Sequence, residues 1–242
     1  MTTSLIGISG ASGGIGRTLA RTVPWPGARV IGIGRHPLDG TEHLADLADP
    51  RSWPVVGSSF KEELARFDGE RVVFIQAPGT LDPIGFAGEV EEGAYAANVL
   101  LNGAAPQVLG HPFLAAVREV DARRHLAILT SGAARSVYPG LTSYGAAKGR
   151  GPVGATRGPS RNCEAVSMLA IAPGTVDTGM QAQLRETSEK DLPKRQKFVD
   201  LHTGGKLSDP EESARQIWGL LDRGLDNGSV VDLREMALTL PG

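Results

Sequence analysis

Three residues in the middle of the chain have the types and spacing of a proton-transfer site: Ser131, Tyr144 and Lys148. A free tyrosine hydroxyl has a pKa near ~10, so it is a poor acid-base catalyst at neutral pH. Lys148 follows Tyr144 by four residues, so on a helix both lie on one face. We therefore expect the lysine charge to lower the pKa of the tyrosine. Ser131 closes an apolar run, where its hydroxyl can hydrogen-bond a substrate oxygen beside the tyrosine.

A glycine-rich loop near the N-terminus has the context of a dinucleotide-binding site. It lies between an expected strand and an expected helix, and its chemistry-bearing residues are Gly10, Ser12, Gly14, Ile15 and Gly16. Glycines allow a tight turn and a close approach of backbone to a pyrophosphate, and the helix N-terminus favours negative charge. The alternative is an ordinary glycine-rich turn, which the placement between strand and helix makes the weaker interpretation.

The residue after the second expected strand bears on cofactor choice. About ~20 residues beyond such a loop, an NAD-preferring site carries a carboxylate for the ribose hydroxyls. This chain has Gly34 followed by Arg35 there, and an arginine can pair with a 2′-phosphate. The sequence therefore favours NADP(H), the alternative being that Arg35 is a solvated loop residue.

Apolar runs alternate with amphipathic stretches, which is typical of an α/β protein with a doubly wound parallel sheet. The chain shows no repeat and no linker, so we expect one domain over residues 1–242. The expected strands are Leu5–Ser9, Arg29–Gly34, His43–Leu47, Arg71–Gln76, Leu126–Ser131, Ala165–Ala172 and Ser229–Asp232. The expected helices are Gly14–Val23, Lys61–Phe67, parts of Val90–Val120, and Pro210–Arg223, the last capped by Asp209.

One segment does not fit this pattern. Gly149–Asn162 holds four glycines and two prolines where the helix of Lys148 would continue, and these residues break helices. We hypothesise that it reflects a local frameshift in the gene or its reading, which intact mass and peptide sequencing would test.

Composition excludes several classes of protein. The net charge of −2 gives no sign of a nucleic-acid or membrane-surface partner. No apolar run reaches the ~18–20 residues that span a bilayer, and the N-terminus lacks the basic region of a signal peptide. The lone Cys163 allows no intrachain disulfide, and the five histidines show no metal-ligand spacing. We expect a cytoplasmic protein without a metal.

With the loop and the Ser…Tyr-x-x-x-Lys site together, the chain resembles the short-chain dehydrogenase/reductase family. The family's Gly-x-x-x-Gly-x-Gly loop is matched by Gly10, Gly14 and Gly16, and its serine commonly lies thirteen residues before its tyrosine, as Ser131 does. The resemblance implies a Rossmann-type sheet of about seven strands in the order 3-2-1-4-5-6-7. It also implies further site residues: Asn98 as a fourth catalytic residue, and the cofactor contacts Asp46, Leu47, Pro173, Gly174, Val176 and Thr178.

Within the family the chain is similar to sepiapterin reductases and to benzil reductases that form (S)-benzoin, on phrases such as Thr130-Ser-Gly-Ala-Ala134 and Pro173–Gln181. This resemblance implies an NADPH-dependent reduction of a ketone beside a second carbonyl, a homodimer, and a substrate lid over residues 179–206. In it, Tyr144 donates the proton, Ser131 positions the oxygen, Lys148 lowers the tyrosine pKa and holds the nicotinamide ribose, and Asn98 anchors a relay water. Two alternatives stay open: a dinucleotide-binding sensor without turnover, and a secondary-alcohol dehydrogenase.

The chain departs from the family after the fourth expected strand. The family's Asn-Asn-Ala-Gly is here Gln76-Ala-Pro-Gly79. Since those asparagines mainly brace the sheet and the cofactor loop, we expect the change to bear on local stability more than on chemistry.

Overall fold

Seven parallel strands form one sheet in the order β3-β2-β1-β4-β5-β6-β7, which is the predicted order. The computed structural model describes residues 3–36, 42–149 and 166–236. The strands are β1 (Ser4–Ser9), β2 (Arg29–Gly34), β3 (Glu42–Leu44), β4 (Arg71–Gln76), β5 (Arg123–Leu129), β6 (Val166–Ala172) and β7 (Ser229–Asp232). Their predicted positions are confirmed, with shifts of a few residues at the ends of β3 and β5. The residues of the expected sixth strand before Val166 lie outside the described ranges.

The strands form where apolar runs can be covered on both faces. All six residues of β4 are buried, and β4 lies between β1 and β5 with Ile6 opposite Val73 and Phe74 opposite Leu126. A strand buried on both faces is an almost continuous apolar run in the sequence. The chain crosses from β3 back to β4, next to β1, so the strand order reverses between β1 and β4.

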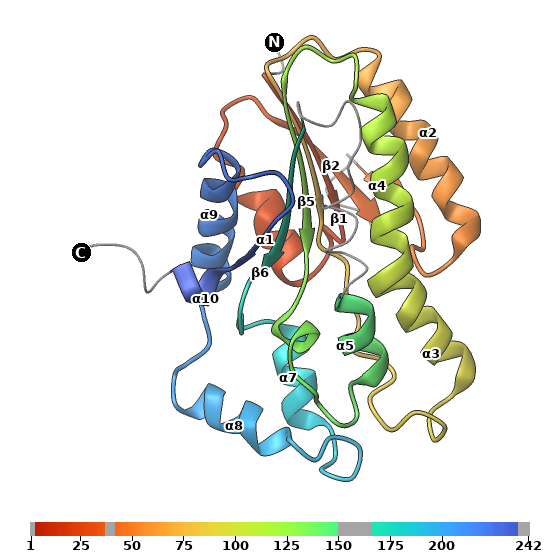
Figure 1. Ribbon diagram of the computed structural model, residues 1–242, viewed down its shortest axis with the longest axis vertical. Helices are drawn as coiled ribbons and strands as arrows, with labels where there is room; N and C mark the ends of the chain where they lie inside the picture. Colours follow the sequence, from red (N-terminus) through yellow and green to blue (C-terminus); the bar gives the residue numbers. More distant parts are fainter. Residues whose placement is uncertain (1–2, 37–41, 150–165, 237–242) are drawn as a thin grey trace.

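Helices cover both faces of the sheet (Figure 1). The helices α1 (Gly14–Arg21) and α9 (Pro210–Leu221) contribute Leu19, Ile217 and Trp218 to the core on one face. The helices α2 (Trp53–Leu64) and α4 (Ala105–Ala116) contribute Phe60 and Phe113 to the core on the other. The remaining helical segments are η1 (Pro50–Ser52), α3 (Glu92–Val99), the π-helical η2 (Leu100–Ala104), η3 (Gly132–Ala134), α5 (Thr142–Lys148), α7 (Gly179–Glu186), α8 (Arg195–Thr203) and α10 (Leu233–Met236).

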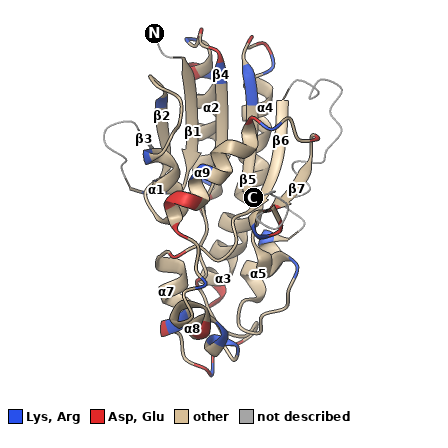
Figure 2. Ribbon diagram, turned by 90° about the vertical axis from the view of Figure 1, so that its left-hand side faces the viewer, with Lys and Arg blue, Asp and Glu red and all other residues tan. Residues whose placement is uncertain are grey.

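Segments α5, α7 and α8 lie beyond the carboxyl ends of the strands, where Figure 1 and Figure 2 both place them below the sheet. Ligands of open α/β sheets bind at this edge, at the point where the strand order reverses. The fold thus places α5, which carries Tyr144 and Lys148, at the edge where a ligand is expected. In the described ranges, no helix is both long and apolar enough to cross a membrane.

The second helix was predicted wrongly. The sequence predicted Lys61–Phe67, whereas α2 runs from Trp53 to Leu64. Pro54 stands in its first turn, where the missing N–H costs nothing. Packing of the buried Val56, Phe60 and Leu64 on the core outweighs the low helix propensity of the Gly57-Ser-Ser stretch.

Two predicted helix boundaries are confirmed. Asp209 Oδ1 accepts a hydrogen bond from the Glu212 N–H at 2.9 Å, so Asp209 caps α9. Helix α5 ends at Lys148 with Gly149 as its C-terminal flanking residue. The rest of the Gly149–Asn162 segment lies outside the described residues.

Candidate active site

A cavity of about 640 Å³ lies at the carboxyl ends of the strands. Segments that follow β1, β2, β4, β5 and β6 line it, together with α5 and α7. The structure brings the predicted site residues together here, except Gly16, which packs against Gly10 and does not line the cavity. Lining the cavity are Gly10, Ser12, Gly14, Ile15, Arg35, Asp46, Leu47, Asn98, Ser131, Tyr144, Lys148, Pro173, Gly174, Val176 and Thr178.

The glycine-rich loop has the shape of a phosphate cradle. Gly10 has φ +76° and Gly14 has φ +47°, in the left-handed region that favours glycine. A side chain at Gly16 would collide with the carbonyl oxygen of Gly10, so α1 can begin this close to the loop only with glycine there. The first turn of α1 holds no acidic residue. These features fit the pyrophosphate of a dinucleotide.

The cavity lining includes the residues that the sequence assigned to the adenine ribose. Arg35 is exposed directly after β2, and a Cβ built on Gly34 would lie 4.0 Å from the Ser12 hydroxyl. Asp46 and Leu47 line the same cavity. His36 also lines the cavity beside Arg35. The sequence analysis did not single out His36, and only its position next to Arg35 could have indicated a place in the site.

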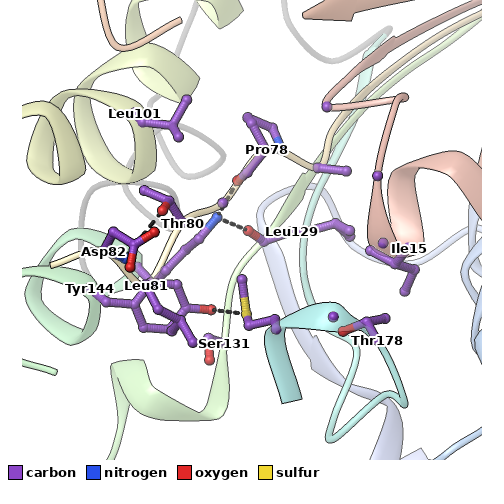
Figure 3. Close-up of a pocket in the computed structure, with 18 of the residues that line it drawn as sticks. Ile15, Pro78, Thr80, Leu81, Asp82, Leu101, Leu129, Ser131, Tyr144 and Thr178 are labelled. Carbon is purple, nitrogen blue, oxygen red and sulfur yellow. Dashed lines mark hydrogen bonds between the residues drawn. The ribbon is translucent and has the colours of Figure 1, made fainter. Parts of the chain in front are cut away.

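Helix α5 ends at Lys148, a buried residue that lines the cavity together with Pro78 and Leu129, both labelled in Figure 3. Lys148 Nζ donates hydrogen bonds to the carbonyl oxygens of Pro78, at 2.9 Å, and Leu129, at 3.1 Å. The Thr130 hydroxyl donates to the Lys148 carbonyl at 2.6 Å. Burial lowers the pKa of Lys148 to about 8, because a dry environment disfavours the ammonium form.

The Tyr144 side chain is buried, and its hydroxyl lies 3.8 Å from the sulfur of Met180, to which it donates (Figure 3). Burial raises the pKa of Tyr144, and a hydrogen bond with Ser131 opposes that rise. The predicted direction was therefore wrong for this structure. The reason is that desolvation of the phenolate dominates, while the Lys148 ammonium is directed to two main-chain carbonyls.

Ser131 lies two residues beyond the end of β5, in extended conformation. Its Oγ accepts a hydrogen bond from the Ala133 N–H at 3.1 Å, which fixes the direction of the side chain. Together with the Tyr144 contact, this arrangement gives two hydroxyls that can approach one substrate oxygen.

Two buried asparagines fasten the segment after β4 to the helix that faces it. Asn98 donates to the carbonyls of Thr80, at 3.1 Å, and Asp82, at 2.7 Å. Asn102, inside the π-helical turn, donates to Asn98 Oδ1 at 3.0 Å and accepts from the Thr80 N–H at 3.3 Å. Both amide hydrogens of Asn98 are thus used within the protein, so its role in a proton relay stays a prediction.

The sequence did not single out Asn102, which lies close to Gly79, as Lys148 does. A Cβ built on Gly79 would lie 3.4 Å from Asn102 Oδ1 and 3.7 Å from Lys148 Cε. Gly103 also allows α5 to approach, since a Cβ there would lie 3.2 Å from that of Ala147. The Asn-Gly pair within an expected helix was the only sequence signal for this close packing.

Residues of the expected lid contribute an apolar wall to the cavity. Met180, Leu184 and Phe198 line it, and Leu201 packs against the same cluster as a partly buried residue. His202 is exposed and is not among the lining residues. Among the described residues, no group of three His, Cys, Asp or Glu side chains has the arrangement of a metal site.

Comparison with known proteins finds two bacterial relatives. The chain is 30% identical to a benzil reductase ((S)-benzoin forming) of Bacillus subtilis over 94% of its length and 97% of that enzyme. It is 29% identical to the benzil reductase ((S)-benzoin forming) of Bacillus cereus, over 89% of this chain and 92% of that one. No family model matches.

A short-chain dehydrogenase/reductase of Saccharomyces cerevisiae has the same fold, with a TM-score of 0.82, 19% identity and 98% of each chain covered. The chain therefore belongs to the short-chain dehydrogenase/reductase family of oxidoreductases. Its two bacterial relatives are benzil reductases by name.

Proposed function

We propose that this protein is an NADPH-dependent carbonyl reductase that reduces one ketone of a 1,2-dicarbonyl substrate. The observation that supports this most is the convergence of Ser131, Tyr144 and Lys148 in one cavity with the glycine cradle. The two bacterial benzil reductases support the substrate class.

Each site residue has a separate role in the proposed reaction. A bound reduced nicotinamide supplies the hydride, and the protein supplies binding and electrostatics. Ser131 hydrogen-bonds the substrate oxygen, and Tyr144 donates its proton to that oxygen. Lys148, held by two carbonyls, gives the positive charge that stabilises the resulting phenolate. The segment Pro173–Thr178 contacts the nicotinamide.

Two bacterial relatives that are reductases by name support reduction over alcohol oxidation. The presence of Ser131, Tyr144 and Lys148 in the same cavity supports an enzyme over a dinucleotide-binding sensor without turnover.

Oxidation of NADPH in the presence of benzil tests the proposal. Tyr144→Phe is expected to keep NADPH affinity and lose at least about 100-fold in kcat, as removal of a general acid does. Tyr95→Phe is the matched control, because Tyr95 is a partly buried tyrosine outside the cavity lining. Equal activity of Tyr144→Phe and the wild-type enzyme would refute the assignment.

Arg35 is proposed to select NADPH through its 2′-phosphate. Arg35→Ala is expected to weaken NADPH about 10- to 100-fold with little effect on NADH, because a charge-assisted hydrogen bond is lost. Arg21→Ala, an exposed arginine at the end of α1, is the control. Equal weakening of both cofactors by Arg35→Ala would remove the proposed selectivity.

A further inference from the structure

An arginine from the C-terminal part of the chain lies beside Gly132, the residue that follows the proposed catalytic serine. Arg234, in α10 directly after β7, lines the cavity. A Cβ built on Gly132, the residue after Ser131, would lie 3.1 Å from Arg234 Nη2 and 3.7 Å from Nη1. A Cβ built on Gly174 would lie 3.1 Å from Arg234 Cγ. Two glycines thus make room for the stem and the head of this side chain.

A buried carboxylate fixes the orientation of the guanidinium. Asp232 accepts from Arg234 Nε at 2.9 Å and from Nη2 at 2.6 Å, and it also accepts from the Arg234 main-chain N–H at 3.1 Å. The Asp232 side chain is 1% exposed, whereas that of Arg234 is 54% exposed. The pair therefore has a buried acidic end and an open basic end.

The open end still has hydrogen-bond donors. A guanidinium has five N–H groups, and Asp232 takes Nε–H and one hydrogen of Nη2. Within the described part of the chain, the other three N–H groups make no hydrogen bond. Arg234 holds the pKa of Asp232 below its usual value, so the pair is ionised on both sides and carries no net charge.

We propose that Arg234 is a specificity-determining residue that donates a hydrogen bond to the second carbonyl oxygen of the substrate, next to the carbonyl held by Ser131 and Tyr144. The inference rests on the proposed reductase function and names the group that recognises the dicarbonyl. The carbonyl carbons of a 1,2-dicarbonyl are bonded to each other, so the second oxygen lies close to the one that Ser131 holds. A donor beside Gly132 that lines the same cavity is therefore placed for that second oxygen. The charge balance with Asp232 favours a neutral acceptor over a carboxylate.

Benzil and deoxybenzoin test this proposal, since deoxybenzoin keeps the two-ring frame and lacks the second carbonyl. Arg234→Met is expected to lower kcat/KM for benzil about 10- to 100-fold, the loss for a hydrogen bond from a charged donor. It is expected to leave deoxybenzoin nearly unchanged. If deoxybenzoin is not turned over, its inhibition constant against benzil gives the same comparison.

Arg135→Met is the matched control, because Arg135 is 50% exposed and also pairs with an acid, Glu235, at 3.1 Å, but does not line the cavity. Arg234→Lys, which keeps a charged donor, is expected to recover part of the preference for benzil. NADPH affinity, measured by fluorescence, and the thermal midpoint are recorded for each variant.

Equal losses on benzil and deoxybenzoin, or a parallel loss of NADPH affinity, would overturn the inference and assign Arg234 a structural or cofactor role. The wild-type enzyme could instead prefer phenylglyoxylate, which carries a carboxylate beside its ketone, over benzil. If that preference disappears in Arg234→Met, Arg234 binds a carboxylate and not a neutral carbonyl oxygen, and the proposal is wrong. Failure of the proposed function is distinguished at once, since the wild-type enzyme would then oxidise no NADPH with any of these carbonyl compounds.

Discussion

His125 is expected to make this protein sensitive to acid. It is buried at the start of β5, and in the described structure neither ring nitrogen has a hydrogen-bond partner. Burial, helped by the charge of Arg71, lowers its pKa from 6.5 to about 4, while Asp222 opposes the shift and Arg123 adds to it. The folded protein therefore keeps this ring neutral over a range in which the unfolded chain takes up a proton.

The size of the effect follows from the two pKa values. The folded pKa is depressed, so the contribution is fully present above pH 6.5 and is lost as pH falls toward 4. Linkage with these values gives a loss of about 2.5 kcal/mol in the free energy of unfolding between pH 7.5 and 4.5. That is a large part of the ~5–15 kcal/mol that stabilises a typical domain.

Urea unfolding at pH 7.5 and 4.5 measures this loss. Carboxylates also titrate in this window, so the informative quantity is the difference between the wild-type protein and His125→Gln. The variant is expected to lose about 2.5 kcal/mol less than the wild-type protein on acidification. His111→Gln, which changes an exposed histidine of α4, should lose as much as the wild-type protein.

Identical pH dependence of the wild-type protein and His125→Gln would refute the argument. It would mean that His125 is protonated in the folded state near pH 6, with the Asp222 carboxylate as its partner. A variant too unstable to measure at pH 4.5 is replaced by His125→Leu, for which the same reduction is expected.

Two further outcomes follow from local contacts. The pKa of Lys148, about 8, predicts that kcat/KM falls above pH 8 as the ammonium loses its proton. Lys148→Arg should remove this alkaline decrease in kcat/KM. An unchanged decrease in the variant would assign it to another group. Asp209→Ala removes the cap of α9 and should lower the free energy of unfolding by about 1 kcal/mol in urea titrations, whereas Asp226→Ala, beyond the end of that helix, is the control for loss of an acidic side chain.

The sequence predicted those parts of the fold that depend on local pattern. The strand β4 was found because it is a continuous apolar run between turn residues, and the helix α9 because Asp209 and Pro210 mark its start. Helix α2 was misplaced because tertiary packing, such as that of Phe60 on Phe74 and Phe113, rather than helix propensity, stabilises the part of the helix before Lys61.

The candidate site was predicted where a motif carries it and missed where long-range packing creates it. The glycine loop was predicted from its glycines and its place between a strand and a helix, and the Tyr-x-x-x-Lys pair from its combination with Ser131 and that loop. Asn102 and Arg234 belong to no motif. Asn102 contacts Thr80, which is 22 positions earlier in the chain, and Arg234 contacts Gly132, which is 102 positions earlier. The rise in the Tyr144 pKa was missed for the same reason, since desolvation depends on what covers the hydroxyl.

Met180, a residue of the cavity wall, occupies the position beside the Tyr144 hydroxyl where a substrate oxygen would bind. A thioether sulfur is a weak acceptor, and here Met180 provides it at 3.8 Å. A carbonyl oxygen is a stronger acceptor, so it can replace the sulfur with a gain, provided that Met180 moves. Met180 is in the first turn of α7, which begins directly after Thr178, a residue of the proposed nicotinamide segment. Met180, which covers the proposed proton donor, is thus only two residues from Thr178. The proposed cofactor contact at Thr178 and the residue that covers the Tyr144 hydroxyl, Met180, therefore belong to the same three-residue stretch of chain.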